Sequence, residues 1–215
     1  MNQAYHDSRF TPDPRRDVLW QTLWRAYFRQ RVPKNACVLD LGAGYGQFIN
    51  NIVARRRIAI DSWPGFSASL APGVEAITGD VTDLSMIEDG GVDFAFASNL
   101  FEHLTQRQLA STLVALRKKL APTGTLTILQ PNFRYAFREY FDDYTHVTVW
   151  SHVSLADFLV ANGFEILELR PRFLPLTIKS RLPVWPVLIR AYLALPIKPL
   201  GKQMLVVARV RRSAN

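Results

Sequence analysis

Three glycines at alternate positions, Gly42, Gly44 and Gly46, follow an apolar run that ends in Asp40. Glycine permits positive backbone φ angles and leaves no side chain between the backbone and a ligand that lies across the turn. The pattern predicts a buried strand, a tight turn and then a helix over residues 47–55. Because ligands of open parallel sheets bind beyond the carboxyl ends of the strands, we expect a ligand at this turn.

The spacing of these glycines separates two kinds of ligand. A nicotinamide-binding turn has the pattern G-x-G-x-x-G, in which the third glycine lets the helix pack close to the strand. Here Gln47 takes that place, and the chain reads G-x-G-x-G. The departure disfavours a nicotinamide-dependent dehydrogenase, which remains an alternative. A turn that only connects two elements is a second alternative, so the later positions are needed to decide.

The segment D-L-G-A-G-Y-G at residues 40–46 resembles the first motif of the class I S-adenosylmethionine-dependent methyltransferases, of the small-molecule, methyltransferase-11-like type. The resemblance covers residues 32–169 well and the last predicted strand fairly. It implies an α/β, Rossmann-like fold: a seven-stranded, mostly parallel sheet with helices on both faces and an antiparallel last strand. It also implies S-adenosylmethionine as the cofactor and methyl transfer as the activity.

The ends of the next three predicted strands carry the other residues that the resemblance assigns to the cofactor. In the resembling family an acid at the position of Asp61 binds the ribose hydroxyls. Asp80 would cap the adenine amino group, and Val81 would cover the ring. The backbone of Asn99 and Leu100 would contact the methionine end. The predicted cofactor-binding residues are therefore Asp40, Gly42, Ala43, Gly44, Asp61, Asp80, Val81, Asn99 and Leu100.

The acceptor side is predicted in residues 131–152, an irregular stretch rich in reactive side chains that leaves the fifth predicted strand at its carboxyl end. Loops in such positions commonly carry substrate contacts. A hydroxyl acceptor needs a base, for which His146 and His103 are the candidates, although a lone histidine is more often structural. The segment D-Y-T-H resembles segments of several small-molecule methyltransferases. The predicted acceptor-side residues are Asp142, Asp143, Tyr144, His146 and His103.

The kind of acceptor is restricted by the tetrapeptide after the fourth predicted strand. It reads N-L-F-E, whereas the methyltransferases that modify amino groups of nucleobases or glutamine carry D/N-P-P-[YF] there. We therefore expect a hydroxyl of a small molecule, a glycan or a lipid-linked compound. The alternative from another class is a catalytically inactive adaptor that binds a membrane or a protein through its basic tail. The complete set of cofactor residues weighs against that alternative.

The remaining helices and strands are predicted from the spacing of apolar residues and from the capping, proline and glycine residues at their ends. Asp13-Pro14 opens a helix to about residue 29. This helix either packs on the sheet or, as the resemblance to the methyltransferases implies, acts as a lid that brings Arg9, Phe10 or Arg16 near the site. We expect one domain over residues 1–215. Further helices are predicted over 106–120 and from 154 to before Gly163, and strands over 36–41, 58–60, 74–78, 92–98, 125–129, 164–169 and 204–210.

The tail holds the whole basic excess of the chain. Residues 170–215 contain 10 Lys and Arg and no acid, whereas residues 1–169 contain 16 Lys and Arg and 18 acids, which together give the net charge of +8. An insertion over about 173–202 includes an apolar stretch in which Pro186 opens a short helix that stops before Pro196. Two interpretations remain open: an interface to a second copy or an arm on the sheet edge, and a membrane-surface anchor with basic residues on anionic headgroups.

Composition sets the remaining expectations. The single Cys37 lies in the first predicted strand, cannot form an intrachain disulfide and suits a reducing compartment. No metal site is indicated, and no nucleic acid is expected, because the basic residues alternate with aliphatic ones. The start of the chain has no apolar core typical of a signal peptide. We therefore predict a cytoplasmic enzyme that works at the inner face of the membrane if its acceptor is lipid-linked.

Overall fold

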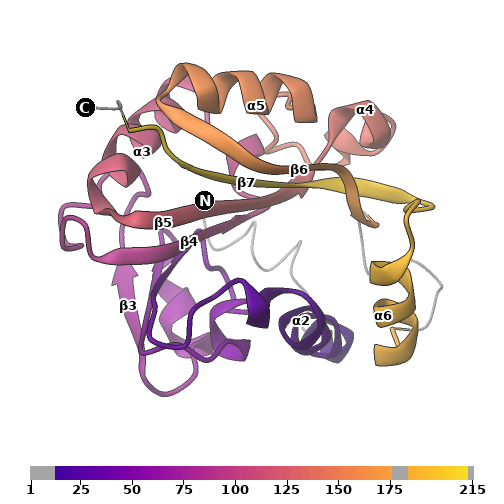
Figure 1. Ribbon diagram of the computed structural model, residues 1–215, viewed down its shortest axis with the longest axis horizontal. Helices are drawn as coiled ribbons and strands as arrows, with labels where there is room; N and C mark the ends of the chain where they lie inside the picture. The colour runs from indigo at the N-terminus through magenta and orange to yellow at the C-terminus, as the bar shows by residue number, and fades with distance from the viewer. Residues whose placement is uncertain (1–12, 176–183, 213–215) are drawn as a thin grey trace. The chain divides into compact units, whose positions relative to one another are not determined.

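The computed structural model describes residues 13–175 and 184–212 of the 215-residue chain. The strands in these ranges form one sheet in the order β3-β2-β1-β4-β5-β7-β6. Their bounds, which can be followed in Figure 1, are β1 Cys37–Leu41, β2 Arg56–Asp61, β3 Val74–Thr78, β4 Val92–Ser98, β5 Leu120–Pro131, β6 Phe164–Pro175 and β7 Gly201–Val210.

Strand direction follows the predicted class. Strand β2 pairs in parallel with both β1 and β3, and β4 pairs in parallel with β5. Strand β7 is antiparallel to both β5 and β6. A mostly parallel seven-stranded sheet with an antiparallel last strand, surrounded by helices, confirms the predicted fold class. Strands β3 and β4 have the predicted bounds, and β2 ends at Asp61 as predicted.

The chain divides into two compact units. The first unit comprises residues 1–81 and 177–197, and the second comprises 82–176 and 198–215. The described helices of the first unit are α2 Pro14–Ala26, η1 Phe28–Gln30, η2 Ile49–Asn51, η3 Pro64–Ser69 and α6 Pro186–Ala194. Those of the second unit are η4 Phe101–His103, α3 Gln106–Lys119, α4 Phe133–Ala136, η5 Tyr140–Asp142 and α5 His152–Ala161.

Helix α2 begins as the sequence predicts and ends slightly earlier. The Asp13 side chain accepts a hydrogen bond from the Arg15 backbone N–H at 3.0 Å, which satisfies one of the donors at the start of the helix. Trp20 and Leu23 are buried on its inner face, and the Trp20 ring meets the Phe48 ring edge-on at 5.9 Å. The burial favours a packing role, and the lid role stays a prediction; residues 9 and 10 lie outside the described part of the chain.

The prediction of a helix over residues 47–55 is wrong. The glycine turn is followed only by the short turn η2, and Ile52 is already extended. The reason lies in Asn50, whose side chain donates to the Ser69 carbonyl at 2.8 Å and accepts from the Ala71 N–H at 2.7 Å. These bonds fix Asn50 to the loop before β3.

Two predicted boundaries in the second unit are corrected. Helix α5 begins earlier than the predicted Ser154, because Ser151 and Ser154 form a reciprocal capping box in which Ser154 is the third helical residue. Strand β5 continues through residues 122–124, where a turn was predicted, with its pairing to β4 shifted at that point. Gly163, with a φ of +86°, follows the end of α5 as predicted.

The connection from β6 to β7 contains the predicted short helix. Strand β6 runs to Pro175, beyond the predicted residue 169, and β7 starts at Gly201. Helix α6 begins at Pro186 and ends at Ala194, shortly before Pro196, which confirms the predicted proline boundaries. Within the first unit it packs against α2. Residues 176–183, which include Lys179 and Arg181 of the basic tail, lie outside the described part of the chain.

Candidate active site

The glycine turn of the first unit has a backbone that favours glycine at all three positions. The φ angles are +65° at Gly42, +52° at Gly44 and +67° at Gly46. The backbone N–H groups of Gly42 and Ala43 donate to the Ile60 carbonyl at 2.9 and 3.2 Å, which joins the turn to the end of β2. The turn is therefore fastened to the residue that precedes Asp61.

Asp61 is held by two backbone donors, one on each carboxylate oxygen. Gly44 N–H donates to one oxygen at 2.8 Å, and Trp63 N–H donates to the other at 2.8 Å. The residue is nearly buried. An ionised carboxylate offers about four acceptor positions, so two hydroxyl groups of a ligand can still bind to it. This arrangement suits the predicted ribose-binding role, and it also fixes the carboxylate in place before a ligand arrives.

The space around the glycines agrees with a ligand that lies against Gly44. A Cβ atom added at Gly44 would meet no atom within 4 Å, whereas one at Gly46 would lie 2.7 Å from a Leu70 methyl carbon and 2.9 Å from the Asn50 side-chain nitrogen. The backbone at Gly44 therefore borders open space, and that at Gly46 is packed against the protein. The turn fits a cofactor at Gly44, and Gly46 is needed for packing.

Asp40 and Asp80, the other predicted acids, differ in environment. Asp40 is buried, and burial raises the pKa of its carboxyl well above the ordinary value, with the nearby Asp61 adding to the shift; hydrogen bonding from the Ile49 backbone opposes it. This environment indicates a role in holding the turn. Asp80 is exposed just beyond β3, and Val81 is buried beside it. Both positions are open to the predicted roles, which stay predictions.

Sequence reasoning missed one contributor to the glycine-turn site of the first unit. Trp63 is buried, donates to Asp61 through its backbone, and lies against the Tyr45 ring with 5.0 Å between the ring centroids. It thereby joins the glycine turn to the segment after β2. An aromatic residue two positions after the acid was the only available signal.

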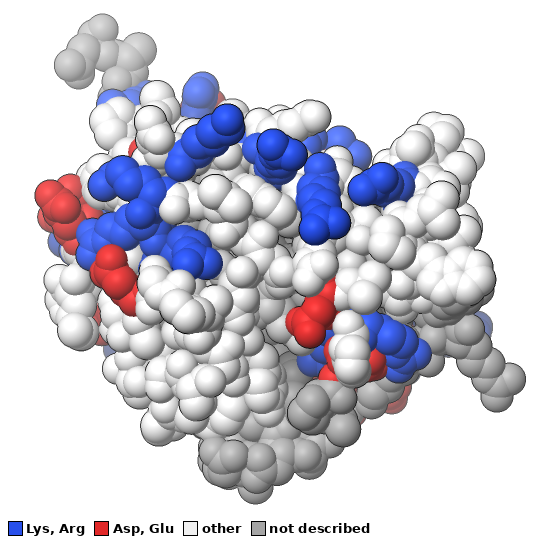
Figure 2. All heavy atoms as spheres, turned by 90° about the horizontal axis from the view of Figure 1, so that it is seen from below, with Lys and Arg blue, Asp and Glu red and all other residues white. Residues whose placement is uncertain are grey.

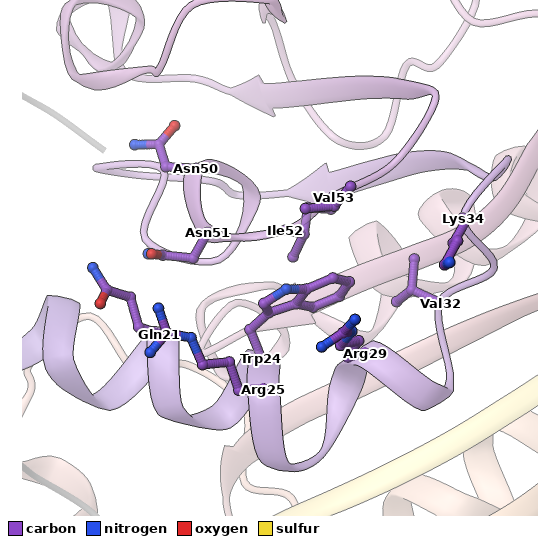
Figure 3. A pocket seen from close by; sticks show the side chains of 10 residues that line it. All are labelled: Gln21, Trp24, Arg25, Arg29, Val32, Lys34, Asn50, Asn51, Ile52 and Val53. Carbon is purple, nitrogen blue, oxygen red and sulfur yellow. The ribbon is translucent and has the colours of Figure 1, made fainter. Parts of the chain in front are cut away.

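A separate pocket of the first unit contains none of the predicted site residues. It has a volume of about 620 Å³ and lies between α2 and the segment after the glycine turn, where the predicted helix is absent (Figure 3). Three basic side chains and the Trp24 ring face it. Its lining consists of Gln21, Trp24, Arg25, Arg29, Val32, Lys34, Asn50, Asn51, Ile52 and Val53.

In the second unit, Asn99 follows β4 in a left-handed conformation. Its φ is +49°, a region in which asparagine is enriched among non-glycine residues. Its side-chain oxygen accepts from Gln203 of β7 at 3.0 Å, and its backbone N–H donates to the Leu129 carbonyl at 2.8 Å. Leu100 next to it is buried. Gln203 was not predicted, because its contact with Asn99 joins residues far apart in the sequence.

The two predicted bases lie side by side. The ring centroids of His103 and His146 are 4.8 Å apart, and His146 Nε2 is 4.0 Å from a carboxylate oxygen of Glu102. Glu102 is fully buried, and neither of its carboxylate oxygens has a hydrogen-bond partner within the described part of the chain. Together Glu102, His103 and His146 form what we call the acceptor cluster.

A hydrogen-bonded chain leads from Asp143 to His103. Thr145 Oγ1 donates to Asp143 Oδ1 at 2.6 Å, and the same hydroxyl lies 2.9 Å from His103 Nδ1. Because the hydroxyl hydrogen points to Asp143, we assign the proton of this pair to His103 Nδ1, which donates to Thr145. Asp143 thus acts on His103 through Thr145, which was not predicted. Tyr144, by contrast, is an exposed residue of the same loop, and its predicted catalytic role stays a prediction.

The loop that carries His146 is fastened to the segment after β4. Backbone N–H groups of Val147 and Thr148 donate to the Glu102 carbonyl at 2.9 and 3.1 Å, and Thr148 Oγ1 donates to the Leu104 carbonyl at 2.6 Å. The Trp150 indole donates to the Phe101 carbonyl at 3.1 Å. These long-range bonds bring His146 to His103. Asp142 lies in the same loop but is exposed.

Burial controls the charge of the acceptor cluster. Desolvation raises the pKa of Glu102 from the ordinary 4.5 to about 8, and the neighbouring Asp143 adds to this shift. Tyr140 beside His146 is also fully buried, its hydroxyl donates to the Thr148 carbonyl at 2.7 Å, and burial raises its pKa. His146 Nδ1 lies 2.5 Å from the Tyr140 carbonyl, which only accepts, so this nitrogen carries the proton.

The chain matches a family model described as a methyltransferase domain over residues 15–169. This match covers most of the chain, which therefore belongs to the methyltransferase-domain family. The chain is an S-adenosylmethionine-dependent methyltransferase, as the resemblance at the glycine turn predicted. No curated protein matches the sequence significantly.

Solved structures share the fold. An S-adenosylmethionine-dependent methyltransferase from Archaeoglobus fulgidus is 19% identical, with a TM-score of 0.69, over 95% of this chain and 97% of that one. A second, from Mesorhizobium loti, is 17% identical, with a TM-score of 0.63, over 87% and 97% of the two chains. The DhpI–SAH complex is 17% identical, with a TM-score of 0.62, over 98% and 92%. At these identities the likeness concerns the fold alone.

Proposed function

We propose that the chain methylates a hydroxyl oxygen of a small-molecule, glycan or lipid-linked acceptor. The observation that supports this proposal is the Asp143–Thr145–His103 chain, which orients one histidine and fixes its Nδ1 proton. A neutral histidine in this tautomer has its lone pair on Nε2, which can accept the proton of a hydroxyl group. An acceptor that is already a good nucleophile would not require such an arrangement.

The reaction can be written with His103 as the base. S-adenosylmethionine, when bound, would supply the acceptor oxygen with the methyl group of its cationic sulfur and would itself be left as a neutral thioether. The hydroxyl proton passes to His103 Nε2, and the imidazolium is stabilised through Thr145 by Asp143. In the first unit, Asp61 and Gly44 would hold the cofactor. Positioning the two reactants supplies much of the acceleration in such transfers.

A lipid-linked acceptor is favoured by the surface of α6 and the residues that flank it. None of the residues of this helix is buried, and the exposed fractions of Trp185, Val187 and Ile197 are 61%, 66% and 74%. In the described ranges, no helix is both long and apolar enough to cross a bilayer. An exposed apolar helix in a chain of net charge +8 suits binding at an anionic membrane surface. Figure 2 shows Lys and Arg side chains gathered along the upper part of one face of the protein. A cytoplasmic enzyme at the inner membrane face is part of this proposal.

The first test is calorimetry of the purified protein with S-adenosylmethionine and, separately, with NAD. We expect micromolar binding of S-adenosylmethionine and none of NAD. Methyl transfer is then assayed with radiolabelled cofactor against hydroxyl-bearing lipid and glycan extracts. The variant His103→Gln is expected to lose methyl transfer to hydroxyls by on the order of 100-fold and to keep cofactor binding. Full activity of His103→Gln, or labelling of nitrogen only, would overturn the proposal.

A further inference from the structure

The acceptor cluster consists of the residue types that hold transition-metal ions. Glu102, His103 and His146 each offer one ligand atom, and these three atoms lie within 4.8 Å of one another. All three belong to the second unit. Two imidazoles and one carboxylate form a common site for divalent first-row ions, with the remaining positions open to water or substrate. The sequence alone indicated no metal, because His146 stands more than 40 residues after Glu102 and His103.

We propose that Glu102, His103 and His146 bind a divalent transition-metal cation on the acceptor side of the enzyme.

The buried carboxylate is the observation that points to a ligand. Glu102 has no exposed surface, and neither of its oxygens has a hydrogen-bond partner in the described ranges. A buried polar group without a partner typically destabilises the folded state, and more so if it is charged. A carboxylate of this kind is stable if it takes up a proton or binds a cation. The two histidines next to Glu102 can coordinate the same cation.

The hydrogen bonds of the two rings prepare them as ligands. His146 Nδ1 donates to the Tyr140 carbonyl, and His103 Nδ1 donates to Thr145. In this tautomer each ring carries its lone pair on Nε2, and His146 Nε2 is the atom on the side of Glu102. Metal-binding histidines typically donate their second nitrogen to a carbonyl or carboxylate in this way. Asp143, at the end of the Thr145 chain, adds negative charge near the cluster.

The three ligand atoms, which lie within 4.8 Å of one another, would have to move closer together around an ion. Ligand atoms about 2.1 Å from a tetrahedral or octahedral ion lie about 3.0–3.4 Å apart. The distance between His146 Nε2 and Glu102 Oε1 is 4.0 Å. Side-chain rotations that move these atoms by about one ångström or less would therefore close this pair around an ion. Loop residues 147 and 148 remain bonded to the Glu102 backbone and need not move.

An ion at this place would change how the acceptor is activated. An oxygen bound to the ion loses its proton more easily, and the histidines would then act as ligands instead of as bases. This consequence rests on the proposed methylation of a hydroxyl, whereas binding of the ion does not. Binding is therefore tested on the full chain without cofactor or acceptor, and the two proposals can fail separately.

The experiment titrates chelator-treated protein with Zn²⁺ by calorimetry and with Co²⁺ by visible absorption. We expect one ion per chain, with proton release and a Co²⁺ spectrum that shows nitrogen ligands. Glu102→Gln keeps the side-chain shape but removes the charge, and should weaken binding at least about 10-fold; His146→Asn should do the same. His152→Asn is the matched control, since His152 lies in the same unit and its ring hydrogen-bonds to Asn132.

Two results would overturn the metal site. One is the absence of binding up to millimolar ion in protein whose circular dichroism shows that it is folded. The other is binding that Glu102→Gln and His146→Asn leave unchanged, or that His152→Asn weakens equally. If Glu102→Gln fails to fold, ion binding is measured with His103→Asn and His146→Asn, and unchanged binding in both would overturn the site.

Discussion

The carboxylate of Asp61 accepts a hydrogen bond from the backbone N–H of Gly44 at 2.8 Å. The acid that ends β2 and the turn that follows β1 are thereby joined without any bound ligand. A ligand that replaces or shares this bond meets a carboxylate that is already oriented. The glycine turn and Asp61 both belong to the first unit, and the packing and binding roles of Gly46 and Gly44 can be tested separately.

Alanine at Gly44 and at Gly46 should have different effects. Both positions have positive φ, so alanine costs roughly 1–2 kcal/mol of stability at either. At Gly44 the new methyl group enters open space, and we expect cofactor affinity to fall at least about 10-fold. At Gly46 it clashes with Leu70 and Asn50, so a further loss of about 1–3 kcal/mol is expected. Urea unfolding and calorimetry with S-adenosylmethionine measure the two effects. Equal stability losses with unchanged affinity in Gly44→Ala would contradict the cofactor position.

Much of the fold could be predicted because its signals are local. Strands β3 and β4 are runs of apolar or alternating residues with turn-forming residues at their ends, and their bounds agree with the sequence. The helix over 47–55 was predicted incorrectly. Residues 47–55 include two asparagines and three β-branched residues, which have low helix propensity. Asn50 is also fixed by Ser69 and Ala71, which are distant in sequence, and this contact could not be predicted.

In the candidate site, too, the residues in a local sequence pattern could be predicted and those brought together by long-range contacts could not. The glycine turn and Asp61 follow from a pattern within one stretch of chain. The acceptor cluster depends on bonds such as that between Trp150 and the Phe101 carbonyl, which bring together segments 49 residues apart. Nothing in the sequence indicates that Glu102 is fully buried or that Thr145 lies between Asp143 and His103. The two histidines were predicted by residue type and position in their segments, and their common location was not.

Removal of the Thr145 hydroxyl should reduce turnover without affecting binding. In Thr145→Val, His103 Nδ1 loses the hydroxyl at 2.9 Å and keeps only the Thr145 backbone carbonyl at 3.3 Å, and Asp143 loses a donor. We expect kcat to fall on the order of 10-fold to 100-fold with KM little changed, since the bond acts on proton transfer. Thr145→Ser should restore most of the activity, because it restores the hydroxyl. Val153→Ala, at an exposed position of the same unit, is the control and should be nearly as active as the natural protein. A change in KM alone would indicate a structural role.

The pKa of Glu102 predicts a pH dependence of stability. The folded carboxyl holds its proton up to about pH 8, whereas the unfolded one releases it near pH 4.5. The folded state therefore binds more protons in this window, and its stability falls as the pH rises, by up to about 1.4 kcal/mol for each pH unit. Below pH 4.5 and above pH 8 this contribution is constant. His103, His146, Asp143 and Tyr140 surround Glu102 and can titrate as well. The contribution of Glu102 to the pH dependence is therefore isolated by comparing the natural protein with a variant that lacks this carboxyl.

The variant Glu102→Gln lacks the titrating carboxyl, and its free energy of unfolding is compared with that of the natural protein. In the presence of a chelator, the natural protein should lose stability relative to this variant between about pH 5 and pH 8, as measured by urea unfolding. Glu75→Gln is the control, because the Arg56 side chain lowers the pKa of the exposed Glu75 and places its titration below this window. Parallel curves for the natural protein and Glu102→Gln would show that Glu102 is ionised throughout.

Acidic substitutions on and beside α6 should weaken membrane binding. Val187 and Ile197 are exposed apolar residues in the first unit, and each buried CH₂ group contributes about 0.8 kcal/mol on insertion into the acyl boundary. We expect Val187→Asp and Ile197→Asp each to reduce co-sedimentation with anionic liposomes at least about 5-fold.

The control is Met86→Asp, which makes the same charge change at another exposed apolar residue and should reduce co-sedimentation far less. A charge contribution of about 1 kcal/mol per basic residue would remain in all variants and disappear in high salt. Equal losses in all three variants would show that net charge alone governs binding, and α6 would then have to be tested as an interface between two copies of the chain.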